Sequence, residues 1–393
     1  MTGQIKQRIY SIDTLRGVIM IIMALDHVRD FLHITAVDQQ PTNLATTTPL
    51  LFFTRWITHF CAPTFVFLSG ISAWLSGRKK SRKELSIFLI KRGIWLILFD
   101  IIGMSLAFTF NPAYDIFILE VLWAIGGSMI ILGLLVRVST RVIIITGLII
   151  LFGHNLFDYI QVQNNTAGGV LLRLFVTGSG GIFPLGSKIV LAGYTIIPWT
   201  GVMLLGYAAG SLYNAQYSMQ WRRKILLLCG FASISLFIVL RLINGYGDPS
   251  HWAVQKDGVF TFLSFVNTSK YPPSLDFVCM TVGPIIILLA LLESVQNRFT
   301  AFATVYGKVP FFYFVVHFCL VHIITVIAFF ASGYGWKDRA DPKSLFLFRP
   351  AHFGFELWGV YAVWLGVVLI MYWPCKWFGR YKATHTYGWL SYV

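Results

Sequence analysis

The side chains best suited to chemistry stand at the two ends of one apolar stretch, which runs from Ser11 to His33. The stretch reads SIDTLRGVIMIIMALDHVRDFLH, and its apolar centre is long enough to cross a bilayer. An ionisable group near the hydrocarbon core costs roughly 2.5–3.5 kcal/mol on insertion scales, so each one calls for a functional explanation. These groups are Asp13 and Arg16 at the start, and Asp26, His27, Arg29, Asp30 and His33 at the end.

His27 is the first candidate for proton transfer, because the unperturbed pKa of histidine is about 6.5. Asp26 precedes it, and Asp30 follows one helical turn later. A carboxylate can hold an imidazole in one tautomer, as it does in acyl-transfer triads. We predict that His27 is a general base oriented by Asp26 or Asp30. The alternative is a histidine that only forms a hydrogen bond at a helix end.

A second candidate lies in the segment FFTRWITHFCAPTFVFLSG, where Arg55 and His59 are four residues apart and share a helix face. Pro63 cannot donate a backbone hydrogen bond to the carbonyl of His59, which predicts a kink there. We expect His59 to assist His27. The alternative is an ordinary proline kink beside an arginine that reaches toward the membrane surface.

Other ionisable residues in apolar segments have weaker support. Glu120 needs a partner such as Arg55 or Arg173, and a structural ion pair is as good an explanation as a catalytic base. His317 and His322 are five residues apart, which is poor spacing for one metal ion, so we predict that His317 is a core histidine. The five cysteines stand singly without metal-ligand spacing, and no metal is expected.

Composition fixes the class of protein that must position these residues. Of 393 residues, 56% are hydrophobic and only 12% are charged, and the mean hydropathy is +0.70. These values are typical of an integral membrane protein, and apolar runs of about 20 residues favour helices over a barrel. We predict an all-α fold, a single polytopic bundle of about ten transmembrane helices that comprises residues 1–393. The expected spans are 10–29, 51–76, 85–108, 114–136, 141–160, 190–212, 222–243, 273–294, 309–331 and 353–375.

The distribution of lysine and arginine predicts the orientation of the bundle. Basic residues precede the first span, at Lys6 and Arg8, and follow the second, from Arg78 to Lys83. That side is expected to be the cytoplasm, with both termini inside, although the outer loop 332–352 is also basic. The net charge of +15 does not indicate nucleic-acid binding, because the basic residues lie between apolar runs, as in cytoplasmic loops.

Helical geometry places the two ends of the first span on one stripe. Arg16 and His27 are about 20° apart around the helix and roughly 16 Å apart along it. Asp13, Gly17, Met20 and Ala24 fall on the same side. Small residues let a helix or a thin ligand approach closely. This stripe suits a substrate that enters from one side of the membrane and reacts near the other.

The motif SIDTLRGVIMIIMALDH resembles the start of the heparan-alpha-glucosaminide N-acetyltransferase catalytic-domain family. FCAPTFVFLSGISAWL, IPWTGVMLLGYAAG, KYPPSLDFVCMTVGP, GKVPFFYFVVH and WLSYV are similar to bacterial members, in order over nearly the whole chain. The resemblance implies a bundle of ten to eleven spans in which acetyl-CoA binds from the cytoplasmic side. An amino or hydroxyl group of a sugar is then acylated on the other side. The catalytic histidine of animal members lies in the first luminal loop, where this chain has His33.

We therefore expect an acyl-CoA-dependent acyltransferase of the bacterial inner membrane, with direct attack on the thioester. The expected partners are membrane lipid, acetyl-CoA as co-substrate and a sugar or glycan acceptor, without nucleic acid; a homodimer is an open alternative. A proton-coupled transporter and an inactive family member are the rival functions. The residues expected to bind the donor are Arg16, Asp13, Arg78, Lys79 and Lys80, and those expected to bind the acceptor are Arg55, Glu120, Lys270, Tyr271 and His33.

Overall fold

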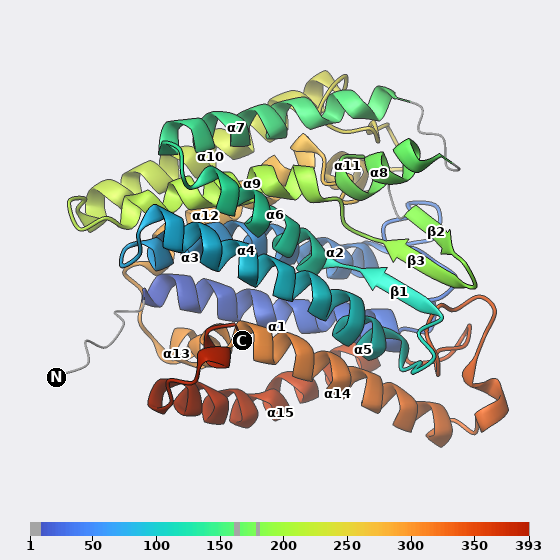
Figure 1. Ribbon diagram of the computed structural model, residues 1–393. Helices are drawn as coiled ribbons and strands as arrows, with labels where there is room; N and C mark the ends of the chain where they lie inside the picture. The colour runs from blue at the N-terminus through green and yellow to red at the C-terminus, as the bar shows by residue number, and fades with distance from the viewer. Residues whose placement is uncertain (1–8, 161–165, 178–180, 393) are drawn as a thin grey trace.

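The computed structural model describes residues 9–160, 166–177 and 181–392 (Figure 1). Lys6 and Arg8, which contributed to the predicted orientation, lie outside these residues. The described chain is mostly helical, and seven of its helical segments are long and apolar enough to cross a membrane. The protein is thus an all-α membrane protein, as the composition predicts. The seven segments are Pro49–Gly77, Thr140–Tyr159, Ile196–Tyr213, Met219–Ile243, Leu275–Leu292, Pro310–Ala331 and Leu357–Thr384.

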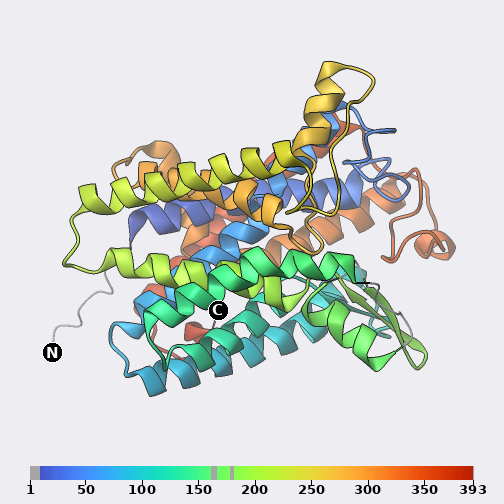
Figure 2. The ribbon, with the colours of Figure 1, turned by 90° about the horizontal axis from the view of Figure 1, so that it is seen from above.

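Three further helices run alongside these segments although they are shorter or more polar (Figures 1 and 2). They are α1 (Tyr10–Leu32), α4 (Arg82–Phe99) and α6 (Val121–Leu135). A π-helical turn, Asp100–Met104, continues α4 into α5 (Ser105–Thr109). The remaining helices are α2 (Pro49–Thr58), α3 (Cys61–Gly77), α7 (Thr140–Gly153), α8 (Ala167–Phe175), α9 (Ile196–Gly210), α10 (Met219–Ile243), α11 (Gly258–Val266), α12 (Leu275–Leu292), α13 (Arg298–Gly307), α14 (Pro310–Ala331) and α15 (Leu357–Thr384).

Two predicted spans were wrong at their first residues, where the structure has short strands. Strands β1 (Ile116–Leu119), β2 (Gly181–Leu185) and β3 (Lys188–Ala192) form a sheet of order β1-β3-β2, with β1 parallel and β2 antiparallel to β3. The expected spans 114–136 and 190–212 therefore begin as strand and become helix only at Val121 and Ile196. Strands of four or five residues are too short to be distinguished from apolar helix ends by periodicity.

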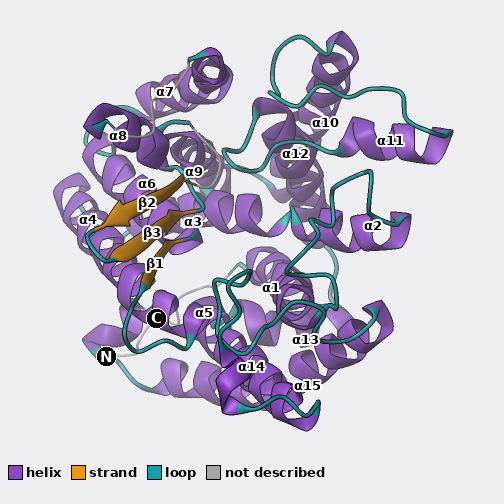
Figure 3. Ribbon diagram, turned by 90° about the vertical axis from the view of Figure 1, so that its right-hand side faces the viewer, coloured by secondary structure: helices purple, strands orange, loops and turns teal. Residues whose placement is uncertain are grey.

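The sheet marks one end of the bundle, which we call the sheet end. Figure 3 looks onto this end, with the strands on one side and α2 and α11 on the other. His33 also lies here, where its backbone pairs with Phe355. The basic turn between α3 and α4 lies at the opposite end, called the loop end, where α1 begins and α15 ends (Figure 1).

Helix pairs approach one another most closely where glycine faces glycine. A Cβ on Gly307 of α13 would lie 1.8 Å from the carbonyl oxygen of Asp13 in α1. A Cβ on Gly17 would lie 1.8 Å from that of Ala303. Small residues let two backbones approach this closely because no large side chain stands between them. The resulting van der Waals contacts help to drive helix association in membranes. Equivalent crossings join α3 to α9 at Gly70 and Gly206, α4 to α6 at Gly93 and Gly126, and α10 to α12 at Gly230 and Gly283.

We predict that Gly307→Ala destabilises the protein by about 1–3 kcal/mol or more, because the new methyl group overlaps the α1 backbone. Thermal unfolding of the detergent-solubilised protein measures the effect. Gly366→Ala in α15 is the matched control, since a Cβ there would meet nothing within 4 Å. The control should be neutral or slightly stabilising, because alanine favours helix more than glycine does. Equal stability of the two variants would contradict the close crossing.

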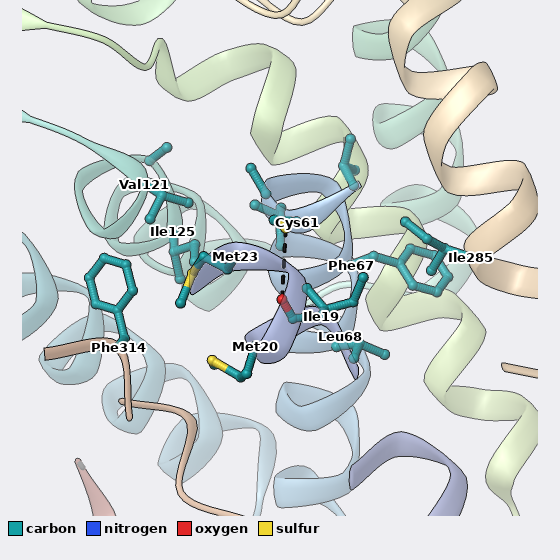
Figure 4. Close-up of a cluster of buried hydrophobic side chains, with 14 of the residues drawn as sticks. Ile19, Met20, Met23, Cys61, Phe67, Leu68, Val121, Ile125, Ile285 and Phe314 are labelled. Carbon is teal, nitrogen blue, oxygen red and sulfur yellow. Dashed lines mark hydrogen bonds between the residues drawn. The ribbon is translucent and has the colours of Figure 1, made fainter. Parts of the chain in front are cut away.

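Larger side chains fill the space between α1 and the neighbouring helices α6 and α14 (Figure 4). Met23 of α1 lies beside Val121 and Ile125 of α6, and Met20 points toward the side of Phe314. The other side of α1 packs on α3, where the Cys61 thiol donates to the carbonyl of Ile19 at 3.8 Å. Methionine is flexible and adapts to its neighbours. Met20 and Met23 form what we call the methionine face of α1. This face is the one best able to rearrange around a bound molecule.

Candidate active site

An ion network at the sheet end ties α1 to α2. Asp26 accepts from Arg29 Nη2 at 2.8 Å and pairs through its other oxygen with Arg55. Arg29 Nη2 also contacts Asp30 Oδ1 at 2.8 Å. Arg29 is 2% exposed and Asp26 is 9% exposed, so these charges are largely removed from water. The network joins two acidic and two basic side chains, so each has an opposite charge in direct contact.

His27 points away from this network toward α14, where it meets His317. The Nδ1 of His27 lies 2.8 Å from the Nε2 of His317, and the rings stack with centroids 5.0 Å apart. The Nδ1 of His317 lies 2.7 Å from the carbonyl oxygen of Tyr313. A carbonyl only accepts, so His317 carries its proton on Nδ1 and accepts at Nε2. His27 must then donate from Nδ1, which leaves its Nε2 as the basic atom.

We call the hydrogen-bonded chain from His27 through His317 to the Tyr313 carbonyl the relay. It bears on the predicted roles of the two acids beside His27 and of His317. Asp26 and Asp30 bind arginine, so the residue that orients His27 is His317 and neither of the acids. His317 is fully buried, as predicted for a core histidine, but it is also the partner of His27. The sequence carried one usable signal, because an ionisable residue inside an apolar span is a functional candidate by default. Spacing could not find the pair, since the two histidines are 290 residues apart.

His59 lies at the break between α2 and α3, where Pro63 predicts a kink. Its ring is 4% exposed and packs edge-on against Phe277, with ring centroids 5.6 Å apart. Its Nδ1 is buried and has no hydrogen-bond partner among the described residues. His59 thus sits on the α12 side of the site, whereas His27 faces α14.

His33 is positioned by the loop that follows α1. Its Nδ1 accepts from the backbone N–H of Thr35 at 3.3 Å and lies 3.0 Å from the Thr35 hydroxyl. Burial, together with the charge of Arg29, lowers the pKa of His33. His33 is therefore a neutral imidazole whose lone pair is already engaged, which makes it a poor base in this arrangement.

Glu120 follows β1 and caps the start of α6. Its backbone N–H donates at 2.7 Å to Asp100 Oδ2, which also accepts from the backbone of Trp123 at 3.1 Å. Asp100 is fully buried at the π-helical turn after α4, a kind of local deformation that is common at functional sites. Asp100 fixes where Glu120 stands, and the sequence analysis did not single it out.

Lys270 and Tyr271 enter the site from the loop before α12. Lys270 Nζ lies 5.0 Å from the ring centroid of Tyr271 and 5.7 Å from that of Tyr194, and the residue is 8% exposed. Its charge acts on the carboxyls of both Asp26 and Glu120. The structure thus brings Asp26, His27, Arg55, Glu120 and Lys270 to one region, as the sequence predicts for a site at this end.

Arg16 lies at the loop end of α1 and is held by the protein. Its guanidinium donates to Asp13 Oδ1, the carbonyl of Gly307 and the hydroxyl of Ser72, each at 3.1 Å. Gly17 lies on the predicted stripe and packs against α13, so a helix and not a ligand approaches α1 at this residue. The face toward α6 and α14 is instead formed by Met20 and Met23, between Arg16 and His27.

A basic cavity of about 220 Å³ opens at the loop end. Arg78, Lys80 and Arg82 line it together with the rings of Trp74 and Tyr207. Lys79 is exposed beside it and does not line it. Guanidinium and ammonium groups bind phosphate, and aromatic rings stack on planar groups. The cavity therefore combines cationic side chains with two aromatic rings, the residue types that bind phosphate and planar groups.

A comparison with known families bears on this geometry. The model for the catalytic domain of heparan-alpha-glucosaminide N-acetyltransferase matches residues 8–241, well over half of the chain. The chain belongs to this family. The match includes His27, His59 and Glu120, whereas His317 and Lys270 lie beyond it. None of the curated proteins matches the chain.

Family membership makes the protein a membrane acyltransferase of the acetyltransferase type. Acyl transfer needs a base for the acceptor, and His27 Nε2 is the atom that the relay leaves basic. Within the described residues, no group of three or more histidine, cysteine or acidic side chains is arranged to hold a metal ion.

Proposed function

We propose that this protein transfers an acetyl group from cytoplasmic acetyl-CoA to an amino or hydroxyl group of a sugar-type acceptor at the outer face of a bacterial inner membrane. The proposal takes the loop end as cytoplasmic and the sheet end as the outer face. The single observation that carries it is the relay from His27 through His317 to the Tyr313 carbonyl. The relay holds one basic nitrogen at the outer end of a helix whose other end carries Arg16.

The donor supplies a thioester, whose carbonyl carbon is open to nucleophilic attack and whose thiolate is a good leaving group. The basic cavity supports binding of its nucleotide phosphates by Arg78, Lys80 and Arg82, with Lys79 beside them. Arg16 and its partner Asp13 would stand at the cytoplasmic start of the methionine face of α1. The thin arm between nucleotide and thioester would lie along Met20 and Met23, which can adapt to it.

In the transfer step, the acceptor nitrogen or oxygen forms a bond to the acetyl carbon, and His27 Nε2 takes the proton that it loses. The bond between acetyl carbon and sulfur then breaks, and the protonated His27 returns that proton to the thiolate. His317 holds the His27 ring in the productive tautomer throughout. His59 stands on the other side of the site as a second group for proton transfer, beside Arg55.

The decisive test uses the purified protein in proteoliposomes with radiolabelled acetyl-CoA and an amino sugar on opposite sides of the membrane. We expect labelled sugar to form only when acetyl-CoA is on the side of the loop end and the sugar is on the side of the sheet end. The orientation of each preparation is measured by protease cleavage of a tag placed at the N-terminus.

Two controls sharpen this result. Vesicles without the protein measure leakage of the substrates across the membrane. A second control contains CoA without its acetyl group in place of the donor, and no acetylated sugar should form in it. If product forms equally well with both substrates on one side, transfer across the membrane is contradicted, whereas acetyltransferase activity is still supported. Uptake of unmodified sugar without acetylation would favour a transporter.

A further inference from the structure

Two ionisable side chains at the sheet end, Lys270 and Glu120, have no opposite charge in direct contact among the described residues. Lys270 is 8% exposed, and Glu120 is only partly exposed. Within the described part of the chain, neither side chain makes a hydrogen bond or an ion pair. Both lie beside the segment that follows β3: a Cβ on Gly193 would be 3.1 Å from Glu120 Oε1, and the ring centroid of the next residue, Tyr194, is 5.7 Å from Lys270 Nζ. The rings of Tyr194 and Tyr271 flank the lysine.

The other charges in this region cannot supply the missing partners. Asp26 is engaged by Arg29 and Arg55, and Asp30 is engaged by Arg29. Each of these groups already has an opposite charge in direct contact. Glu120 and Lys270 therefore stand outside the network formed by Asp26, Arg29, Asp30 and Arg55.

Holding a charged group out of water without a partner is costly. The effective penalty in real proteins is several kcal/mol for each ion. The fold nevertheless fixes both groups: Asp100 binds the backbone of Glu120, and Asp248 accepts from the backbone of Ser269, next to Lys270, at 2.8 Å. Such placement is expected where a ligand provides the partners, because the ligand then recovers the cost as binding free energy.

Both groups are close to the proposed chemistry. Lys270 lies in the loop before α12 at the sheet end, and His27 lies in the part of α1 that approaches this end. Val121, the residue after Glu120, lies beside Met23, one helical turn before His27 (Figure 4). A ligand held by Glu120 and Lys270 would therefore lie at the same end of the bundle as His27.

We propose that Lys270 and Glu120 select an acidic acceptor: Lys270 pairs with a carboxylate or phosphate on the sugar, and Glu120 accepts from its hydroxyl or amino group. This inference rests on the proposed function in naming the ligand an acceptor. It goes further by requiring an acid group on the sugar. The tyrosine rings beside Lys270 provide apolar faces for the sugar ring.

Direct binding tests the inference without relying on turnover. The probes are glucosamine, which has no acid group, glucosamine 6-phosphate and muramic acid, measured by calorimetry on the full chain without acetyl-CoA. We expect the phosphate or the carboxylate probe to bind at least about tenfold more tightly than glucosamine, since hydrogen bonds to charged groups contribute about 1.5–3 kcal/mol. Lys270→Gln should abolish that preference and leave glucosamine binding within about twofold.

The matched control is Lys256→Gln, which removes the same charge from a lysine that packs over Phe260 in the nearby loop. It should leave the preference unchanged. Glu120→Gln should weaken all three probes alike, because its proposed contact is common to them. Tighter binding of glucosamine 6-phosphate would indicate a phosphate on the acceptor, and tighter binding of muramic acid would indicate a carboxylate.

An equal affinity of the wild-type protein for all three probes, or an unchanged preference in Lys270→Gln, would overturn the inference. Failure of the proposed function looks different. In that case acidic sugars would bind with the expected dependence on Lys270, but no acetylated product would form with acetyl-CoA.

Discussion

Replacing His27 by alanine should lower kcat about 10²–10⁴-fold, the range that a positioned general base contributes. The loss follows from the relay, because His27 Nε2 is the basic atom that the contacts with His317 and Tyr313 define. The measurement is release of CoA thiol from acetyl-CoA in the presence of an amino sugar. Binding of acetyl-CoA should stay close to wild type, since the basic cavity lies at the other end of the bundle.

Variants of His317 separate positioning from direct chemistry. A glutamine at this position can still accept the His27 Nδ1–H through its side-chain oxygen, whereas leucine cannot. His317→Gln should thus retain more activity than His317→Leu, and the leucine variant should show an altered pH profile of kcat. His251→Ala, at an exposed histidine, serves as the control. Turnover of His27→Ala at the wild-type rate would remove His27 from the reaction and direct attention to His59.

The second large effect is on stability. Asp26→Ala should cost about 3–5 kcal/mol, because it leaves Arg55 buried without its acid. Arg29 keeps Asp30, so most of the loss should arise at Arg55. Thermal or denaturant unfolding in detergent provides the measurement. The double variant Asp26→Ala/Arg55→Met should be more stable than Asp26→Ala alone, since it removes the orphaned charge.

Asp38→Ala is the matched control for this prediction. Asp38 lies in the loop that follows α1 and pairs loosely with Lys343 at 3.7 Å and His352 at 3.6 Å. An exposed pair of this kind contributes about 0–1 kcal/mol. If the two alanine variants were equally stable, Asp26 would not be the centre of the ion network that joins α1 to α2.

Much of the fold follows from simple features of the sequence. Apolar length predicts the long helices, and Pro63 predicts the break at His59. The strands of the small sheet were missed because each is short and continues directly into, or lies near, an apolar helix. Gly17 was placed on a stripe open to either a helix or a thin ligand, since spacing alone cannot tell a glycine that meets a helix from one that lines a path.

The site was predictable as a set of residue types but not as a set of contacts. Asp26, His27 and Arg55 were singled out because each is an ionisable group in an apolar segment. The orientation of His27 depends on His317, which belongs to a helix 290 residues away in sequence. That Glu120 and Lys270 make no ion pair can be seen only in the structure, after Asp26, Asp30, Arg29 and Arg55 have been found to pair with one another. A sequence pattern shows which ionisable residues stand in apolar segments. Only the packing of the helices shows which of them lack an ion-pair partner.

The way in which the relay ends has a bioenergetic consequence. Two adjacent imidazoles inside a membrane could form part of a proton wire and short-circuit the gradient across it. Here the chain stops at the carbonyl of Tyr313, a backbone oxygen that can accept a hydrogen bond but cannot take up a proton and pass it on. His27 can therefore exchange a proton with a bound molecule, while the histidine pair conducts none toward the opposite side.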